Sequence, residues 1–449
     1  MKNELRNHAE EIFKAGVERV NPANLLSRVL SVANNHLKIK TDTEEFSVDL
    51  SVFNKIKIIA IGKAASSMAF SLNDILGKSI TDGLIISKEQ STKALPVLYK
   101  TLISTHPIPD HKSEEAGKKL LDFCKNCTNE ELVIGLISGG ASSLVEVPGD
   151  GLSLADLQNA TELLLKSGAT IHEMNCIRKH LSKIKGGHLS QAIFPAISLN
   201  FILSDVIGDD LSVIGSGLTA PDDTTYADAL EIVKKYKITS KFPVAVVDYL
   251  EKGNKGEILE TIKSGDSRMM NTKNVLVGSN KTALKGARDK AQELGYETII
   301  LSDKIQGEAR DVALKFYSFS RQVDSGALMK LPACIIAGGE TTVTVTGNGL
   351  GGRNQEMALA YLTLMDEESD LTTKQIFLSA STDGGDGPTD VAGAFADYSL
   401  MKNAQDAGID PEDYLDRNDS YHFFKKVGGH LITGPTQTNV CDLQILIII

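Results

Sequence analysis

The chain has few cysteines, no long apolar run and no excess of positive charge. Five cysteines in 449 residues are too few for a disulfide framework, so we expect a reducing, cytoplasmic setting. No hydrophobic run approaches membrane-spanning length, and residues 1–6 have neither the basic start nor the apolar stretch of a signal peptide. The net charge of −11 argues against nucleic-acid and membrane-surface partners, which need a positive footprint. An anionic substrate would require a local cluster of Lys and Arg.

Composition predicts a compact protein with more than one domain. The chain is 42% hydrophobic and 23% charged and has no long low-complexity tract. At 449 residues it exceeds what one hydrophobic core usually spans.

Cys124 and Cys127 have the spacing of a redox motif or half a zinc site, but no second pair accompanies them, so we expect ordinary thiols.

Residues 347–356, Gly-Asn-Gly-Leu-Gly-Gly-Arg-Asn-Gln-Glu, form a glycine-rich turn before a helical run from Gln355 to Leu364. We expect an alternating strand over residues 341–346 to precede this turn. Glycines let a backbone approach a phosphate closely, the first amides of a helix are unpaired donors, and Arg353 adds a planar charged fork. The turn therefore predicts an anion site, although an ordinary tight connection has the same pattern.

Further glycine loops follow strand-like apolar runs. They are residues 138–143, residues 338–341 and the acidic loop over residues 381–390, which carries Asp383, Asp386 and Asp390. Open α/β sheets place their ligands at the carboxyl ends of strands, so loops of complementary charge indicate one phosphate-handling cleft. A nucleotide and a divalent metal would suit it.

Strand, loop and helix alternate along the chain, which predicts an α/β fold whose sheets are largely parallel or mixed and are flanked by helices. Amphipathic helices are expected over residues 5–20 and 23–37. A charged, irregular stretch over residues 235–266 marks the domain boundary, which gives an amino-terminal Rossmann-like domain over residues 1–245 and a carboxyl-terminal α/β domain over residues 246–449.

Seven ordered motifs resemble the class II glycerate kinases, whose carboxyl-terminal region is called MOFRL. These motifs cover residues 61–65, 138–143, 175–187, 204–209, 339–342, 351–356 and 382–390. The resemblance extends over nearly the whole chain and places the MOFRL region at about residues 331–445. Cys176 and Gln437 depart from the expected small residues, but neither is assigned to chemistry.

This resemblance implies ATP-dependent phosphorylation of D-glycerate at its 2-hydroxyl, with Mg²⁺, in a cleft between the two domains. It also fits the lack of a Gly-x-x-x-x-Gly-Lys-Ser/Thr loop in this chain. Small molecules are the expected partners, and both a monomer and a homodimer remain open. Regiochemistry rests on the resemblance alone.

Phosphoryl transfer needs in-line placement and positive charge on the transferring group. Lys63 lies between a strand and a helix and would place a charge on the phosphoryl or the carboxylate, although a surface lysine is the plain alternative. Arg353 is expected to stabilise the transition state. Asp205 would orient the 2-hydroxyl and accept its proton, or bind metal, or simply cap a helix.

Other predicted site residues follow from the loops and the family motifs. We expect Mg²⁺ ligation by Asp383 and Asp386, although Asp-Gly is also ordinary turn chemistry. Arg178 and Lys179 are expected on a helix that faces the cleft, unless that face is simply solvated. The predicted substrate- and nucleotide-binding residues are Gly139, Gly140, Ser142, Ser143, Asn175, Arg178, Lys179, Glu340, Thr341, Gly351, Gly352, Asn354, Glu356, Thr382, Gly384 and Gly387.

An oxidoreductase is the alternative function, because relatives of the family have been labelled hydroxypyruvate reductases. The turn at Gly347 would then bind a nicotinamide dinucleotide. However, no acidic residue ends a clear second strand about twenty residues on to hold the ribose, and the acidic loop has no task in hydride transfer. His106, His172, His180 and His188 are expected to be structural, since phosphoryl transfer to an alcohol needs no histidine.

Overall fold

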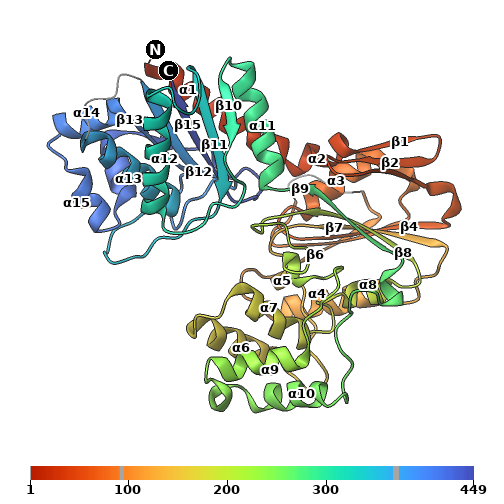
Figure 1. Ribbon diagram of the computed structural model, residues 1–449. Coiled ribbons are helices and arrows are strands. Elements are labelled where there is room, and N and C mark those ends of the chain that lie inside the picture. Colours follow the sequence, from red (N-terminus) through yellow and green to blue (C-terminus); the bar gives the residue numbers. More distant parts are fainter. Residues whose placement is uncertain (1, 92–95, 368–373) are drawn as a thin grey trace. The chain divides into compact units, whose positions relative to one another are not determined.

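The computed structural model describes residues 2–91, 96–367 and 374–449 (Figure 1). These residues form two compact units. Unit 1 is drawn from Met1–Asn21, Asp205–Gly208 and Gly278–Ile449, and unit 2 from Pro22–Ser204 and Asp209–Val277. Neither unit is cut at residue 245, and the division into folding domains over residues 1–245 and 246–449 stays a prediction.

Unit 2 is built on a six-stranded sheet in the order β6-β5-β4-β7-β8-β9. The pairs β6·β5, β5·β4, β4·β7 and β7·β8 are all parallel, so the carboxyl ends of five strands lie along one edge. Every residue of β7 is buried, as expected for a strand covered on both faces. The strands are β4 (Lys55–Ile61), β5 (Asp82–Ser87), β6 (Tyr99–Ile103), β7 (Glu131–Ile137), β8 (Ile197–Leu203) and β9 (Thr272–Gly278).

Helices complete unit 2, and four of them form a separate apolar cluster that Figure 1 shows grouped below the sheet. The cluster consists of α6 (Leu154–Lys166), α7 (Ile171–His180), α9 (Tyr226–Lys235) and α10 (Val244–Asn254). A reciprocal cap between Ser153 and Asp156 starts α6. The remaining helices are α2 (Pro22–Val29), α3 (Ala65–Leu76), α4 (His111–Cys124), α5 (Ala141–Leu144) and α8 (His188–Ile193).

The helix expected over residues 23–37 is wrong in its second half. Helix α2 ends at Val29, and the chain continues as an antiparallel sheet of β1 (Leu30–Ala33), β2 (His36–Lys40) and β3 (Glu45–Asp49). Asn34 and Asn35 both have positive φ, 53° and 62°, as a two-residue hairpin turn requires. The missed signal was this Asn-Asn pair before the alternating Leu37 and Ile39, both fully buried.

Unit 1 contains a mixed sheet in the order β10-β11-β15-β12-β13-β14. Strand β15 is antiparallel to both of its neighbours, so β11 and β12 run the same way on either side of it. All residues of β11, β12 and β15 are buried. The strands are β10 (Glu297–Ile300), β11 (Ala333–Gly339), β12 (Gln375–Ser381), β13 (Gly393–Asp397), β14 (His430–Leu431) and β15 (Asp442–Ile448).

Helices lie on both faces of this sheet, and Figure 1 shows α11 and α12 on opposite sides of it. Helix α13 begins at Arg353 and packs against α12, β12 and β13. The helices are α1 (Lys2–Arg19), α11 (Asn280–Glu293), α12 (Ala309–Asp324), α13 (Arg353–Glu367), α14 (Tyr398–Asp406), α15 (Pro411–Asp416) and α16 (Ser420–Val427).

The strand expected over residues 341–346 is also wrong. Residue Thr342 makes only an isolated bridge to Glu308. The backbone amide of Thr344 donates to the Glu308 carboxylate at 2.9 Å, and that of Thr346 donates to Asn418 Oδ1 at 2.9 Å. The backbone amides of this segment thus donate to side chains and not to a neighbouring strand. Alternation of Thr and Val alone was therefore not sufficient evidence for a strand.

The α/β class is confirmed, with a parallel sheet in unit 2 and a mixed sheet in unit 1. Across residues 2–91, 96–367 and 374–449, we find no helix with the length and apolar character needed to cross a bilayer. The five cysteines are buried and unpaired, as the sequence predicts for Cys124 and Cys127.

Candidate active site

Three strand ends of unit 1 meet at Asp442. In the sheet register, Asp442 pairs with Gly339, the last residue of β11, and with Ser381, the last residue of β12. The segments that begin with Glu340 and Thr382 therefore leave the sheet on either side of Asp442. Polar groups at such strand ends form the usual ligand crevice of α/β sheets.

Arg353, the first residue of α13, binds Asp442 through two parallel hydrogen bonds. Its Nε donates to Oδ2 at 2.6 Å and its NH2 group donates to Oδ1 at 2.8 Å, while NH1 lies 3.0 Å from Glu340 Oε1. Asp442 is fully buried, and the Arg353 side chain remains 27% exposed. This bidentate geometry fixes the plane of the guanidinium and leaves one side of it accessible.

The charges around Arg353 keep its guanidinium protonated, and the neighbouring Glu340 is a weaker acid than usual. Burial acts to lower the pKa of Arg353, but its hydrogen bonds to Asp442 and the charge of Glu340 raise that pKa above its usual value. Burial raises the pKa of Glu340; Arg353 opposes this shift, and the charges of nearby Asp442, Asp205 and Asp383 add to it. Several carboxylates that repel one another favour a cation among them.

Asp205 belongs to unit 1 and lies beside the start of β15. Its carbonyl oxygen accepts a hydrogen bond from Cys441 Sγ at 3.2 Å. Cys441 has a left-handed backbone with φ 68°, and its thiol also lies 4.0 Å from Glu340 Oε2. Burial, together with the charges of Glu340, Asp442 and Asp205, raises the pKa of this thiol, so it stays neutral. Of the sequence-predicted residues, Asp205, Glu340, Arg353 and Asp383 are thus brought together.

The helix start at Arg353 differs from the sequence expectation. The amides of Asn354 and Gln355 are not unpaired donors, because they donate to Oδ1 and Oδ2 of Asp386 at 3.1 and 2.9 Å. Both side-chain amides also donate to the Asp386 carboxylate. The chain's own Asp386 therefore occupies the anion position that we had expected a ligand phosphate to fill.

The glycines before α13 are explained by contacts within the chain. A Cβ at Gly352 would lie 2.3 Å from the Asp386 carboxylate carbon, and one at Gly347 would lie 2.2 Å from the Arg417 carbonyl oxygen. The Gly347 amide donates to Asn418 Oδ1 at 2.9 Å, and the Leu350 amide donates to Asp419 Oδ1 at 3.0 Å. The glycine-rich turn is consequently packed against residues 417–420, and its nucleotide role rests on the prediction alone.

In unit 2, Lys63 follows β4 directly and lies at the carboxyl edge of the parallel sheet. The loops after β4 and β7 touch: the Lys63 amide donates to the Gly139 carbonyl at 2.9 Å, and the Ala64 amide donates to Ser138 Oγ at 3.1 Å. A Cβ at Gly62 would lie 2.1 Å from Ser138 Oγ, so glycine is needed there, where φ is 131°. The Lys63 side chain is exposed.

Ser142, Asn175 and Arg178 are linked by one hydrogen-bond chain through Ser216. Arg178 NH2 donates to Ser142 Oγ at 2.6 Å, Ser142 and Ser216 hydroxyls lie 2.6 Å apart, and Ser216 donates to Asn175 Oδ1 at 2.9 Å. Burial lowers the pKa of Arg178, and Glu146 opposes that shift. The structure thus joins three predicted binding residues beside the turn at Gly140.

Other predicted binding residues have structural partners. Lys179 is buried and its Nζ lies 3.1 Å from Asp222 Oδ1. Glu356 accepts a hydrogen bond from Arg310 Nε at 2.8 Å. Thr382 Oγ1 donates to the Cys441 carbonyl at 2.6 Å and so ties the acidic loop to the start of β15. Ligand roles for these residues stay predictions.

Residues able to hold a metal are limited. Among the described residues, no group of three or more His, Cys, Asp or Glu side chains could hold a metal ion. Asp383 Oδ1 accepts hydrogen bonds from Ser381 Oγ at 2.8 Å and the Gly385 amide at 3.0 Å. Mg²⁺ commonly binds proteins through one or two carboxylates together with substrate phosphates and water. Asp383, with Glu340 and Asp205 nearby, suits that mode; Asp386 is engaged at α13.

Sequence reasoning missed Asp442. The available signal was a lone carboxylate at the start of residues 442–449, a run that is apolar apart from Asp442 and Gln444. A buried charge needs a partner, so this position could have been flagged. Its partner could not have been identified, because Arg353 lies 89 residues earlier in the chain.

Comparisons with known proteins agree along the whole chain. Residues 8–251 match the family described as a domain of unknown function, DUF4147, and residues 333–442 match the MOFRL family. The chain is 38% identical to a glycerate 2-kinase of Pyrococcus horikoshii, covering 99% of this chain and 98% of that protein. A crystal structure of a glycerate kinase from Thermotoga maritima matches with a TM-score of 0.87 at 36% identity, covering 100% of both chains.

A relative from Agrobacterium vitis carries a provisional name, hydroxypyruvate reductase. It is 38% identical, covering 87% of this chain and 98% of that protein.

Proposed function

Because this chain belongs to the glycerate kinase family that combines the DUF4147 and MOFRL regions, we propose that it transfers the γ-phosphoryl group of ATP to the 2-hydroxyl of D-glycerate. The chain is accordingly an enzyme of the kinase class. The products would be 2-phosphoglycerate and ADP.

One observation carries the chemical part of the proposal: Arg353 is held by Asp442 in a fixed plane, beside a group of carboxylates. A transferring phosphoryl group gathers negative charge on its oxygens, and a preorganised cation stabilises that charge without reorganising during the reaction. Arg353 remains protonated, since its pKa is raised. It is our candidate for the group that stabilises the transition state.

Two further residues are proposed to contact the reactants. Lys63 would bind the transferring phosphoryl or the glycerate carboxylate, supported by its exposed position at the carboxyl edge of the parallel sheet. Asp205 would orient the 2-hydroxyl and accept its proton. The charge of Asp205 is among those that raise the pKa of Glu340, which supports its membership of the same carboxylate group.

The remaining predicted residues are proposed to bind substrates. Arg178, Ser142 and Asn175, together with Ser143 and the backbone of Gly139 and Gly140, would hold oxygens of a carboxylate or phosphate. The guanidinium of Arg178 and the serine hydroxyls are donors of the kind that bind such oxygens. A nucleotide would be held near Glu340 and residues 382–387.

Asp383 is the proposed ligand for Mg²⁺. Bound Mg²⁺ would neutralise charge on the ATP phosphates. Asp383 fits because it is half-buried, because Ser381 and the Gly385 amide both donate to Oδ1 of its carboxylate, and because other carboxylates lie near. The metal role of Asp386 remains a prediction, and its four hydrogen bonds to α13 support a capping role.

Cytoplasmic localisation and a monomeric or homodimeric state are also proposed. The five unpaired, buried thiols suit a reducing compartment. The acidic chain, with its net charge of −11, would not be drawn to nucleic acids or anionic membranes.

Hydroxypyruvate reduction is the second candidate, since a relative bears that name. The two functions are separated by one paired assay. The protein is incubated with D-glycerate and Mg-ATP, and ADP is measured; a second sample receives hydroxypyruvate and NADH, and NADH is measured. We expect ADP to form only when D-glycerate is present and NADH to persist. Consumption of NADH without ADP formation would overturn the proposal.

A further inference from the structure

Four loops of unit 2 bring Lys88 and His106 to the same edge of the sheet as the predicted site residues Lys63, Gly139 and Gly140. Lys63 follows β4, Lys88 follows β5, His106 lies just beyond β6, and the Gly139-Gly140 turn follows β7. These strands are parallel and adjacent in the order β6-β5-β4-β7. All four loops therefore leave the same edge of the sheet, where α/β proteins bind their ligands.

His106 lies directly over the glycine turn. A Cβ at Gly140 would lie 2.9 Å from Cδ2 and 3.2 Å from Nε2 of His106, and 3.4 Å from Cγ of Lys63. The absence of a side chain at Gly140, where φ is 83°, thus makes room for the imidazole beside Lys63. His106 is half-buried, whereas Lys63 and Lys88 are exposed.

The charge state of His106 follows from these neighbours. Burial lowers the pKa of His106 to about 4, and the positive charges of Lys63 and Lys88 act in the same direction. The ring is therefore neutral at physiological pH, with one nitrogen carrying a proton and the other able to accept one. A histidine that is kept neutral between two lysines adds a directional hydrogen bond without adding charge.

We propose that His106 is a further substrate-binding residue, whose imidazole N–H donates to an oxygen of the anionic group, carboxylate or phosphate, that Lys63 and Lys88 attract to the Gly139-Gly140 turn. This inference rests on the proposed function, because it assigns residues to the same reactants. From the sequence alone, His106 is expected to be structural, and Lys88 is not among the predicted site residues.

The cluster has the features that an anion site needs. Two ammonium groups supply long-range attraction inside an otherwise acidic chain, and the glycine turn lets a ligand approach the backbone closely. The imidazole supplies a fixed direction, which flexible lysine side chains lack. A bound anion would offset the repulsion from the lysines and raise the pKa of His106.

A titration followed by nuclear magnetic resonance tests this directly. The imidazole Cε1–H resonances are recorded for the full-length protein, and His106 is assigned with the His106→Gln variant. D-glycerate, ATP and inorganic phosphate are added separately. We expect the His106 resonance to move with D-glycerate if the anion is the carboxylate, and with ATP and phosphate if it is a phosphate. His111, whose side chain is 80% exposed, is the internal control and should stay in place.

Variants separate binding from folding. His106→Phe keeps an aromatic ring but loses the donor, so KM for one reactant should rise roughly tenfold to a hundredfold with a smaller change in kcat. His106→Gln keeps an N–H donor and should recover much of the affinity. His111→Phe is the matched control and should behave as wild type. In Lys88→Ala the pKa of His106 should rise, whereas Lys100→Ala, a change at an exposed lysine of β6, should leave it unchanged.

The outcomes distinguish this inference from the proposed function. If wild-type protein turns over D-glycerate and ATP, and calorimetry shows both to bind, while the His106 resonance stays fixed and His106→Phe retains wild-type KM values, then His106 has no binding role and the inference is wrong. If wild-type protein does not phosphorylate D-glycerate, the proposed function fails instead, and binding of phosphate or ATP at His106 is still read from the titration.

Discussion

The carboxylate of Asp442 receives two hydrogen bonds from the guanidinium of Arg353, at 2.6 and 2.8 Å, although 89 residues separate the two in the chain. Asp442 has no exposed surface, so it cannot trade this partner for water without an energetic cost. The pair therefore defines where the positive charge of Arg353 can lie.

Replacement of Asp442 by Asn tests that relationship. The amide keeps the size of the side chain but can accept only at one atom, so Arg353 loses one of its two fixed hydrogen bonds. We expect kcat to fall about 10-fold to 100-fold, as for other groups that orient a catalytic residue, with KM for ATP less affected. Asp406→Asn, a change at an exposed position of α14, is the control. Equal kcat values for wild type and Asp442→Asn would show that Asp442 does not position Arg353 for catalysis.

Lys63 is expected to act in the reaction and not in folding, because its side chain is exposed. Lys63→Ala should lower kcat/KM about 100-fold to 1000-fold, since one preorganised charge is lost. Its unfolding temperature should match that of wild type. Lys78→Ala removes another exposed lysine of unit 2 and should leave both quantities unchanged. Steady-state kinetics measures kcat/KM, and calorimetry measures the unfolding temperature. If the Lys63→Ala enzyme is as active as the Lys78→Ala enzyme, Lys63 does not act in the reaction.

Substitution of Asp386 should affect the stability of the fold, whereas substitution of Asp383 should affect the dependence of activity on Mg²⁺. Asp386→Asn places an N–H group against the donors at the start of α13, which should destabilise the protein by about 2 kcal/mol. Asp383→Asn should leave thermal stability nearly intact but raise the Mg²⁺ concentration needed for half-maximal activity. Thermal unfolding and Mg²⁺ titrations of both variants provide the measurement. Identical stability of Asp386→Asn and wild type would argue against the cap.

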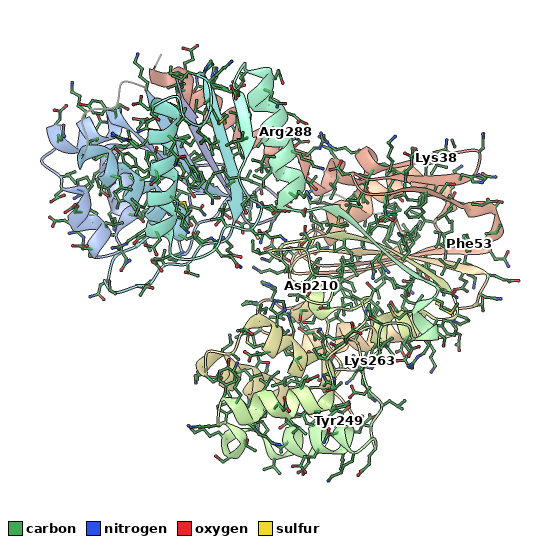
Figure 2. The ribbon with its side chains drawn as sticks, viewed as in Figure 1. Lys38, Phe53, Asp210, Tyr249, Lys263 and Arg288 are labelled. Carbon is green, nitrogen blue, oxygen red and sulfur yellow. The ribbon has the colours of Figure 1, made fainter. Side chains whose placement is uncertain are left out.

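The pH dependence of stability should report on His180. Its Nδ1 lies 2.7 Å from the Cys176 carbonyl oxygen and its Nε2 lies 3.0 Å from Glu260 Oε2, and Lys263, labelled in Figure 2, also contacts Glu260 at 3.0 Å. Burial acts to lower the pKa of His180, but these hydrogen bonds and the charge of Asp222 raise it to about 9. Both nitrogens then donate, which requires the imidazolium.

Because the pKa in the folded state is raised, this stabilisation is fully present below the unfolded-state pKa of about 6.5 and is lost as pH rises through about 9. We expect His180→Gln to be less stable than wild type at pH 6 by at most about 3 kcal/mol. The difference should shrink toward pH 9.5. Calorimetry at several pH values measures it, and a difference that is independent of pH would contradict a charged His180.

Local sequence predicted the strands and loops well where burial dictates the pattern. Residues 132–137 of β7 and 445–448 of β15 are continuous apolar runs, and every residue of these two strands is buried, as expected for strands covered on both faces. Local caps such as Ser153 with Asp156 were equally visible. The sequence also placed Lys63, Glu340 and Asp383 directly after strands, and the structure has them after β4, β11 and β12. Arg353 was expected where the glycine-rich turn meets a helix, and it is the first residue of α13. The catalytic and binding roles of these residues stay predictions.

Long-range partners could not be predicted from local pattern. The insertion of β15 between β11 and β12 brings Asp442 to Arg353, and no short-range signal encodes that register. Asp386 accepts hydrogen bonds from the first amides of α13, which lie 31 and 32 residues away in the chain. The glycine-rich turn therefore had the sequence of a phosphate-binding turn, although a carboxylate of the same chain occupies the anion position. The glycines of this turn are needed because the backbone or a side chain of the same protein packs closely against them, which the sequence cannot distinguish from the close approach of a phosphate.

The most direct measurement compares wild type with Arg353→Ala by ³¹P nuclear magnetic resonance after incubation with D-glycerate and Mg-ATP. A phosphate on the 2-hydroxyl couples to one proton and gives a doublet, whereas a phosphate on the 3-hydroxyl couples to two and gives a triplet. We predict a growing doublet with wild type and a rate reduced about 100-fold to 1000-fold with the folded variant. A triplet, or equal rates for the two proteins, would contradict the account.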